Sequence, residues 1–321
     1  MGRALRIDSL SSQINSLSAK TMQLIAAPFT PFQADGGLNL SMIQPMAKHL
    51  KQSGVDGVFV NGTTGECASL TFAERFLLTE QWMEAGRDAG LKVMIHVGDN
   101  CLTHAEDLAA HAADQGASAV GVMAPYFFKP ADVSALVQWV ECIARRAKDC
   151  PVYYYHIPGM TGVELPVAAF IELALERIPN FRGIKYSQVN PLELLSCLQR
   201  WDQQCEMFYG SDETMLQAVI LGAHGVIGSS YNFAAPLYRK LIAAYEAGNL
   251  ALARQLQQAA ADMIGLLAQS GYLPATKQLM KWHGLDLGPV RLPLTGLAAG
   301  PIQTLCQTID SKLQEAMQLE G

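Results

Sequence analysis

The sequence predicts an α/β protein, a (β/α)8 TIM barrel with a C-terminal helical appendage. From Gln23 onward, short apolar runs alternate with longer amphipathic segments at a spacing of about 30 residues, the pattern of strand–helix units in a parallel barrel. After the eighth apolar run the pattern changes to helices alone. We therefore expect a flexible N-terminal tail over residues 1–22, the barrel over residues 23–248 and C-terminal helices over residues 249–321.

The expected strands are short, apolar and β-compatible, and they are bounded by glycine, proline or polar residues. They cover residues 24–27, 55–60, 93–97, 119–124, 152–155, 181–185, 206–209 and 225–228. The expected helices have apolar residues at helical spacing. They cover residues 41–52, 72–89, 105–115, 133–148, 166–176, 234–247, 250–269, 275–282 and 302–319, and one more begins near Asn190 and Pro191.

The composition favours a cytoplasmic protein and argues against nucleic-acid and membrane partners. The net charge of −6, without a basic run, argues against a nucleic-acid partner. No apolar run approaches the roughly 18 residues that cross a bilayer, so no membrane partner is expected. The seven cysteines are an odd number and form no CxxC pair, which is typical of a reduced cytosolic chain. The first twenty residues are rich in serine and lack the apolar core of a secretory signal.

Lys185 is the first candidate catalytic residue, because it lies at the end of the apolar run 181–185. Burying an unpaired ammonium group is costly, so a buried lysine tends to lose its proton. A neutral amine attacks carbonyl carbon, which makes Lys185 a candidate for forming a Schiff base. The alternative is that the side chain extends into solvent at the strand end, as most lysine side chains do.

The turn after the second expected strand is a candidate anion site. Barrel enzymes place their active sites at the carboxyl ends of the strands. There, Gly62 and Gly65 permit a tight turn, and Thr63 and Thr64 add two hydroxyls beside free backbone amides, which suits a carboxylate or an oxyanion. The alternative is an ordinary glycine-rich connection. Thr71 and Glu74, a little further on, form a capping-box pattern that predicts the start of the next helix.

The fifth expected strand carries three consecutive tyrosines before His156. Side chains alternate along a strand, so Tyr153 and Tyr155 share a face, and one face lines the barrel interior. A phenol near a Schiff-base lysine can move protons between substrate oxygens. The alternative is that the tyrosines only fill space in the sheet.

Polar residues also follow the seventh and eighth strands, where Asp212 and Glu213 offer carboxylates and Ser229 offers a hydroxyl. Such groups suit a polyhydroxylated ligand. The alternative is that they cap the following helices, a role for which Asp212 is well suited. An anion-binding turn, a phenol, a lysine and a polyol-binding patch on one rim together predict an aldolase that acts on a sugar-like 2-oxo acid.

Three motifs carry a resemblance to a known family. The segments Gly62-Thr63-Thr64-Gly65-Glu66, Tyr155-His156-Ile157-Pro158 and Gly183-Ile184-Lys185 resemble the dihydrodipicolinate synthase / N-acetylneuraminate lyase family of class I aldolases. The resemblance runs from about Gln23 to at least Leu294 and is strongest to the animal-type lyases. It implies that Lys185 forms the imine with the substrate's C2 carbonyl, that Tyr155 handles the proton, and that Thr63 and Thr64 hold the carboxylate. It also implies that the sugar tail contacts Ser187, Gly210, Asp212, Glu213 and Ser229.

The resemblance further implies a homotetramer that cleaves N-acetylneuraminate reversibly to N-acetylmannosamine and pyruvate without metal or organic cofactor. Synthases of the family carry an arginine after the fifth strand that pairs with the carboxylate of their aldehyde partner, whereas this chain has Met160 there. Many family members also place a neighbouring subunit's tyrosine at the mouth of the site, where this chain has Phe127 beside Tyr126. We therefore expect either Tyr126 or a shorter proton relay in that place.

Four alternative functions remain open at this point. A sister aldolase, such as one for 2-keto-3-deoxygluconate, would use the same chemistry on a shorter sugar acid, and relative rates distinguish the two. Dihydrodipicolinate synthase activity is disfavoured by Met160. A metal-dependent aldolase could use His96 and His156, and loss of activity to a chelator would reveal it. A barrel that only binds sugar acids would not need the lysine, the tyrosine and both threonines.

Overall fold

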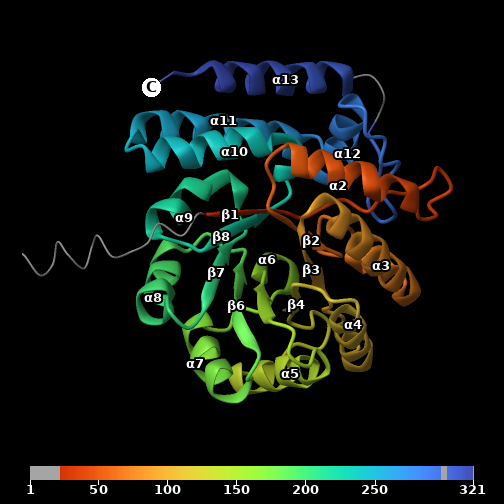
Figure 1. Ribbon diagram of the computed structural model, residues 1–321, viewed down its shortest axis with the longest axis vertical. Coiled ribbons are helices and arrows are strands. Elements are labelled where there is room, and N and C mark those ends of the chain that lie inside the picture. The colour runs from red at the N-terminus through yellow and green to blue at the C-terminus, as the bar shows by residue number, and fades with distance from the viewer. Residues whose placement is uncertain (1–21, 298–301, 321) are drawn as a thin grey trace, which may run out of the picture.

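Eight parallel strands close into a barrel in the order in which they occur along the chain (Figure 1). The computed structural model describes residues 22–297 and 302–320. Each strand pairs with the next, and the last pairs with the first, so the predicted fold class is confirmed. The strands are β1 (Gln23–Ala26), β2 (Gly57–Val60), β3 (Lys92–His96), β4 (Ala119–Met123), β5 (Val152–His156), β6 (Phe181–Tyr186), β7 (Glu206–Tyr209) and β8 (Gly225–Gly228).

Helices surround the barrel and bury its outer face. They are α2 (Ile43–Gln52), α3 (Phe72–Ala89), α4 (Leu102–Asp114), α5 (Val133–Arg146), α7 (Val167–Arg177), α8 (Pro191–Trp201), α9 (Met215–Leu221) and α10 (Tyr231–Glu246). Short helical turns also occur: η1 (Leu40–Met42), η2 (Cys67–Ser69), α6 (Pro158–Thr161) and η3 (Asp212–Thr214). Within the described residues, no helix combines the length and the hydrophobicity needed to cross a membrane.

Three further helices, α11 (Leu250–Gln269), α12 (Tyr272–Trp282) and α13 (Ile302–Gln318), form the C-terminal appendage. In Figure 1, α10, α11 and α13 form a stack of helices on one side of the barrel, and α12 contacts all three of them. The expected tail over residues 1–22 lies outside the described residues, except for Met22, which is buried.

The expected elements match the structure closely, with differences at helix starts. The eighth barrel helix begins at Tyr231, whereas the sequence predicted a start at residue 234. Ala234 has a non-helical backbone and Pro236 lies inside the helix, so α10 consists of two helical pieces joined across a kink. The helices α6 and α9 were not predicted, because four and seven residues are too short for a periodic pattern.

Strand alternation decides which tyrosines of β5 enter the barrel. Tyr153 and Tyr155 pack in the interior with Phe59, Phe208 and Ile227. Tyr154, between them, belongs to the core that the strands form with the surrounding helices. The prediction that Tyr153 and Tyr155 share a face and that one face of β5 lines the interior is therefore confirmed.

The C-terminal segment 287–294, called the strap below, crosses the loops that follow β1 and β2. The Leu287 carbonyl accepts a hydrogen bond from the Phe32 amide at 3.0 Å. Gly288 has φ +69°, and a Cβ atom there would lie 1.9 Å from the Phe32 carbonyl oxygen, so only glycine permits this close approach. The strap thus joins the C-terminal appendage to the carboxyl end of the barrel.

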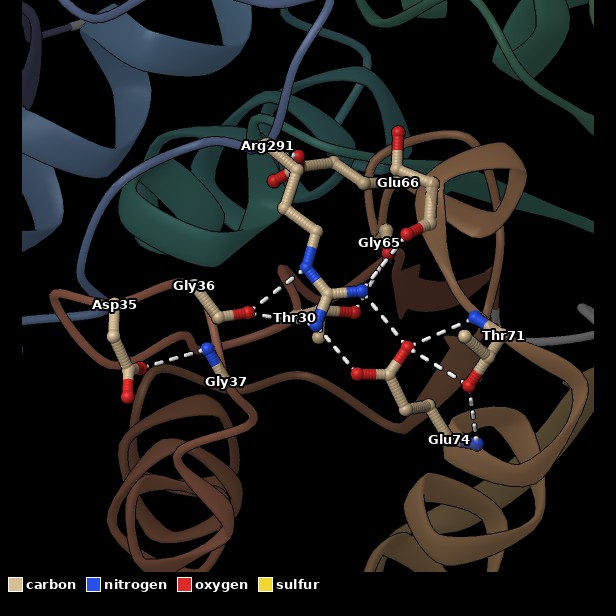
Figure 2. Close-up of polar contacts among 10 residues, drawn as sticks. Thr30, Asp35, Gly36, Gly37, Gly65, Glu66, Thr71, Glu74 and Arg291 are labelled. Atoms are coloured by element: carbon tan, nitrogen blue, oxygen red, sulfur yellow. Dashed lines mark hydrogen bonds and ion pairs between the residues drawn. The ribbon is translucent and has the colours of Figure 1, made fainter.

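Arg291 of the strap pairs with Glu74 in the first turn of α3 (Figure 2). Glu74 also completes the predicted capping box, because its carboxylate accepts from the Thr71 amide while Thr71 Oγ1 accepts from the Glu74 amide. The hydrogen bonds from Arg291, assisted by those from Thr71, lower the pKa of Glu74 to about 2 despite partial burial. The ionised carboxylate is therefore favoured in the folded state.

We expect Glu74→Gln to lower the free energy of unfolding near neutral pH. A carboxyl group with a lowered folded-state pKa stabilises the fold fully above its unfolded pKa of roughly 4.3, and this contribution is lost as the pH falls towards 2. Because solvent partly screens the pair, we expect a loss of about 1 kcal/mol at pH 7. Urea unfolding at pH 7, 5 and 3.5 should show the difference between parent and variant shrinking at the lowest pH. A difference that is constant over this range would contradict the assignment.

Candidate active site

A cavity of about 310 Å³ opens at the carboxyl ends of the strands. Its polar lining comes from the segments at the ends of β2, β5, β6, β7 and β8, which lie far apart in the sequence. All nine predicted site residues line it: Thr63, Thr64, Tyr155, Lys185, Ser187, Gly210, Asp212, Glu213 and Ser229. The structure therefore brings the whole predicted set together, at the end of the barrel where (β/α)8 barrel enzymes hold their substrates.

Lys185 points into this cavity and is only 4% exposed. Its Nζ atom lies 3.6 Å from the centroid of the Tyr155 ring and 4.4 Å from that of Phe59. Among the described residues, none places a carboxylate within ion-pair distance of this nitrogen. The alternative in which Lys185 extends into bulk solvent is therefore wrong, and the amine faces the space that a ligand would fill.

Tyr155 connects the lysine with the turn that follows β2, residues 61–66, called the threonine turn below. Its hydroxyl lies 3.3 Å from Thr63 Oγ1, where either oxygen can donate. The ring packs edge-on against Phe59, with 5.5 Å between centroids, and against His96, with 5.7 Å. The phenol is thus held in one orientation between the amine and the hydroxyl that faces the same cavity, a position from which it can move a proton.

The threonine turn has left-handed backbone at both ends, with φ +57° at Asn61 and φ +56° at Glu66. Neither residue is glycine, and such conformations persist only where the surroundings enforce them. Thr30, in the loop after β1, holds the turn, because its hydroxyl donates to the Gly65 carbonyl at 2.6 Å. At one end His96 Nδ1 lies 2.8 Å from the Asn61 carbonyl oxygen. The turn is therefore a shaped structure and not a loose connection.

The opposite side of the cavity is formed by Asp212 and its neighbours. Asp212 Oδ2 accepts from the Ser230 amide at 2.8 Å and from the Ser230 hydroxyl at 2.5 Å. Burial raises the pKa of this carboxyl group, and the bonds from Ser230 oppose the shift. Gly228 is required here, because a Cβ atom would lie 1.7 Å from Asp212 Oδ1. The alternative in which Asp212 caps the helix that follows it does not hold, since its carboxylate binds Ser230, at the start of α10.

The remaining polar groups of this side are available to a ligand. The Ser187 hydroxyl is buried and has no hydrogen-bond partner in the described part of the chain. It lies against Gly210, where a Cβ atom would come within 2.0 Å of it. Glu213 is exposed at the cavity. Together these residues present hydroxyl and carboxylate oxygens suited to a chain of substrate hydroxyls.

Sequence reasoning missed the contribution of the C-terminal helices to the cavity. Ile264, Tyr272 and Leu273 line it from α11 and α12. The Tyr272 hydroxyl lies 2.8 Å from Ser229 Oγ, and burial raises the pKa of this tyrosine, so its proton is retained. The break in the helical pattern at Gly271 was the available signal, because a helix that restarts next to the barrel can present its first residues to the rim.

The two histidines of the metal-dependent alternative have separate protein partners. His96 bonds the Asn61 carbonyl, and His156 Nε2 lies 2.8 Å from Gln188 Oε1. Burial lowers the pKa of both histidines. In the described ranges, no three histidine, cysteine or acidic side chains gather as a metal site. Neither histidine lines the cavity, whereas Lys185 does.

Three other residues singled out in the sequence lie outside the cavity lining. Phe127 is 74% exposed on the loop after β4, and Tyr126 beside it is also exposed. The Asn100 side chain accepts from both of their amides and so orders this loop. Met160, in α6, is 66% exposed. Among the residues that the structure describes, no arginine lines the cavity, and position 160 is a methionine.

A buried lysine inside a (β/α)8 barrel, facing a cavity beside a phenol and a threonine turn, defines the class of imine-forming aldolases. The comparisons agree with this class. The model of the dihydrodipicolinate synthetase family matches residues 20–312, and the chain belongs to that family.

The chain is similar to N-acetylneuraminate lyases from several sources. It is 40% identical to the N-acetylneuraminate lyase of Xenopus tropicalis over 274 residues, which cover 84% of this chain and 90% of the relative. It is 34% identical to the Proteus mirabilis N-acetylneuraminate lyase, with a TM-score of 0.86 and coverage of 93% of this chain and 99% of that structure. A Ruminococcus gnavus sialic acid aldolase, described as a catalytic lysine mutant, superposes with a TM-score of 0.87 at 27% identity, covering 94% and 98% of the two chains.

Proposed function

We propose that this protein is a class I aldolase, a carbon–carbon lyase that cleaves N-acetylneuraminate reversibly to N-acetylmannosamine and pyruvate. The observation that carries the proposal is the buried Lys185, whose amine faces the cavity beside Tyr155. The names of the similar proteins support this substrate.

The proposed reaction starts with attack of the Lys185 amine on the C2 carbonyl of the open-chain sugar acid, and water leaves as the imine forms. The imine nitrogen withdraws electrons from C2. When the C3–C4 bond breaks, its electron pair moves towards this nitrogen and gives an enamine, while the C4 hydroxyl loses its proton and becomes the aldehyde. Tyr155 relays that proton and returns one to C3. Water then hydrolyses the imine, which releases pyruvate and regenerates the amine.

The other predicted residues bind the substrate in this proposal. Thr63 and Thr64 hold the carboxylate through hydroxyls and backbone amides. The 3.3 Å contact between Thr63 and Tyr155 supports a carboxylate position next to the proton relay. The sugar hydroxyls bond to the opposite side of the cavity, where the candidates are Ser187, Gly210, Asp212, Glu213 and Ser229. No positively charged side chain of the described residues lines that side of the cavity, which suits a neutral polyhydroxy aldehyde.

We also propose a cytoplasmic homotetramer. All seven cysteines are free thiols, as is typical of a reducing compartment. Phe127 and Phe128 are both exposed and contact each other edge to face, and adjacent exposed aromatic side chains are typical of protein interfaces. The tetramer itself rests on the family resemblance.

The substrate assignment predicts that the protein releases pyruvate from N-acetylneuraminate, read as NADH oxidation in a coupled lactate dehydrogenase assay. N-acetylmannosamine should appear in equal amount. The protein should not condense pyruvate with aspartate semialdehyde, because the described lining of the cavity offers acidic side chains and no arginine to the second carboxylate. Faster cleavage of 2-keto-3-deoxygluconate than of N-acetylneuraminate would transfer the assignment to the sister activity.

A further inference from the structure

Lys277 is a second buried lysine, and the proposed chemistry gives it no role. Its Nζ atom lies 2.8 Å from Glu66 Oε1, and both side chains are 1% exposed. The same nitrogen donates to the Pro289 carbonyl in the strap at 2.8 Å. Burial lowers the pKa of Lys277, whereas the Glu66 carboxylate opposes that shift. Buried ion pairs contribute little net stability compared with apolar side chains of similar size, but removal of one partner leaves an uncompensated buried charge, so the two groups stay together in the folded state.

Glu66 is the last residue of the threonine turn, so the contacts that hold Glu66 also hold the turn. Its second carboxylate oxygen accepts from the Arg291 amide of the strap at 2.9 Å. Glu66 has a left-handed backbone, φ +56°, although it is not a glycine. This conformation therefore depends on these contacts. Thr64, two residues earlier, lines the cavity, whereas Glu66 and Lys277 do not.

The Arg291 side chain fastens the strap to the loops on both sides of the turn (Figure 2). Its guanidinium donates to the Gly36 carbonyl at 2.7 Å, in the loop after β1. It also donates to the Ser69 carbonyl at 2.8 Å, in the loop after β2, and pairs with Glu74 in the first turn of α3. A planar guanidinium satisfies several acceptors at fixed angles, which a lysine ammonium cannot do.

We propose that Glu66, Lys277 and Arg291 are positioning residues. They tie the threonine turn to the C-terminal strap and thereby determine how tightly the turn binds the substrate carboxylate. This inference rests on the proposed function of Thr63 and Thr64 as the carboxylate site. The three residues act through the turn and do not touch the substrate. The C-terminal appendage therefore contributes to the affinity of the barrel site through the ion pair and the strap.

A general loss of structure would change both the reactivity of the Lys185 amine and the recognition of the carboxylate, whereas a displaced turn would change only the second. The reactivity of the Lys185 amine depends on its surroundings inside the barrel, whereas recognition of the carboxylate depends on the turn. A ketone without a carboxylate reports the first property alone. Borohydride trapping of the Lys185 imine with pyruvate, and in parallel with acetone, therefore distinguishes a positioning role from partial unfolding.

The variants are Lys277→Met, which removes the buried cation, and Arg291→Lys, which keeps the charge but loses the planar fork. The matched control is Lys281→Met in the same helix, because Lys281 forms an exposed ion pair with Asp286. In both variants we expect the pyruvate concentration for half-maximal trapping to rise by roughly 10- to 100-fold, as for small misplacements of a binding group. Trapping with acetone should equal that of the parent, and the control should match the parent with both ketones.

An unchanged pyruvate requirement, or equal losses with pyruvate and acetone, would overturn the inference. Should Lys277→Met fail to fold, Arg291→Lys carries the test, because its side chain is partly exposed and keeps its charge. A parent protein that forms no adduct with pyruvate would overturn the proposed function and this inference with it. Normal trapping by the parent together with unaffected variants would overturn the inference alone.

Discussion

Lys185→Arg should abolish turnover of N-acetylneuraminate. Arginine stays protonated at any working pH and its guanidinium cannot attack a carbonyl, so no imine forms. Lys185 is buried and faces the cavity, and among the described residues no carboxylate lies within ion-pair distance of its amine. Turnover is measured by the coupled lactate dehydrogenase assay, and an unfolding curve like that of the parent shows that the variant is folded.

Mass spectrometry after borohydride reduction with pyruvate should show one adduct, on the peptide that contains Lys185. Two other lysines serve as internal controls. Lys129 is exposed on the loop after β4, and Lys277 is buried but paired with Glu66. An adduct on either of these lysines, or none at all, would contradict the imine mechanism.

Tyr155→Phe should lower turnover far more than it weakens pyruvate binding. General acid–base assistance contributes about 10²–10⁴-fold to a rate, and phenylalanine has no proton to relay. The Tyr155 hydroxyl lies 3.3 Å from Thr63 Oγ1 and its ring lies beside the Lys185 amine, so the loss falls on the reacting centre. Turnover and half-maximal trapping by pyruvate, measured side by side, separate the chemical step from binding.

Tyr153→Phe is the matched control. Tyr153 shares the interior face of β5 but lies away from the active-site cavity, and its hydroxyl donates to Glu206 at 2.6 Å. This variant should lose some stability and keep its turnover number. A turnover number that is unaffected by Tyr155→Phe would assign the proton to another group, such as Tyr126.

Local patterns in the sequence predicted the barrel and, together with the family resemblance, the nine site residues. The strand–helix repeat reflects the fact that each strand–helix unit buries its own apolar face, so the signal lies within about 30 residues. Once the repeat is known, the carboxyl ends of the strands must meet at one rim, and the polar residues there become candidates. The imine lysine, the threonine turn and the relay tyrosine were found in this way and through motif resemblance. All nine site residues line one cavity, and their roles remain predictions.

Only the tertiary structure decided what surrounds these residues. Tyr272 reaches the cavity from a helix 43 positions beyond Ser229, and Lys277 meets Glu66 although no local pattern links them. Asp212 binds Ser230 across 18 positions and does not cap its own helix. Such contacts join residues that are distant in sequence, and the packing of whole elements determines them. A periodicity read over a few helical turns carries no trace of such contacts, because it reports only which face of an element is buried.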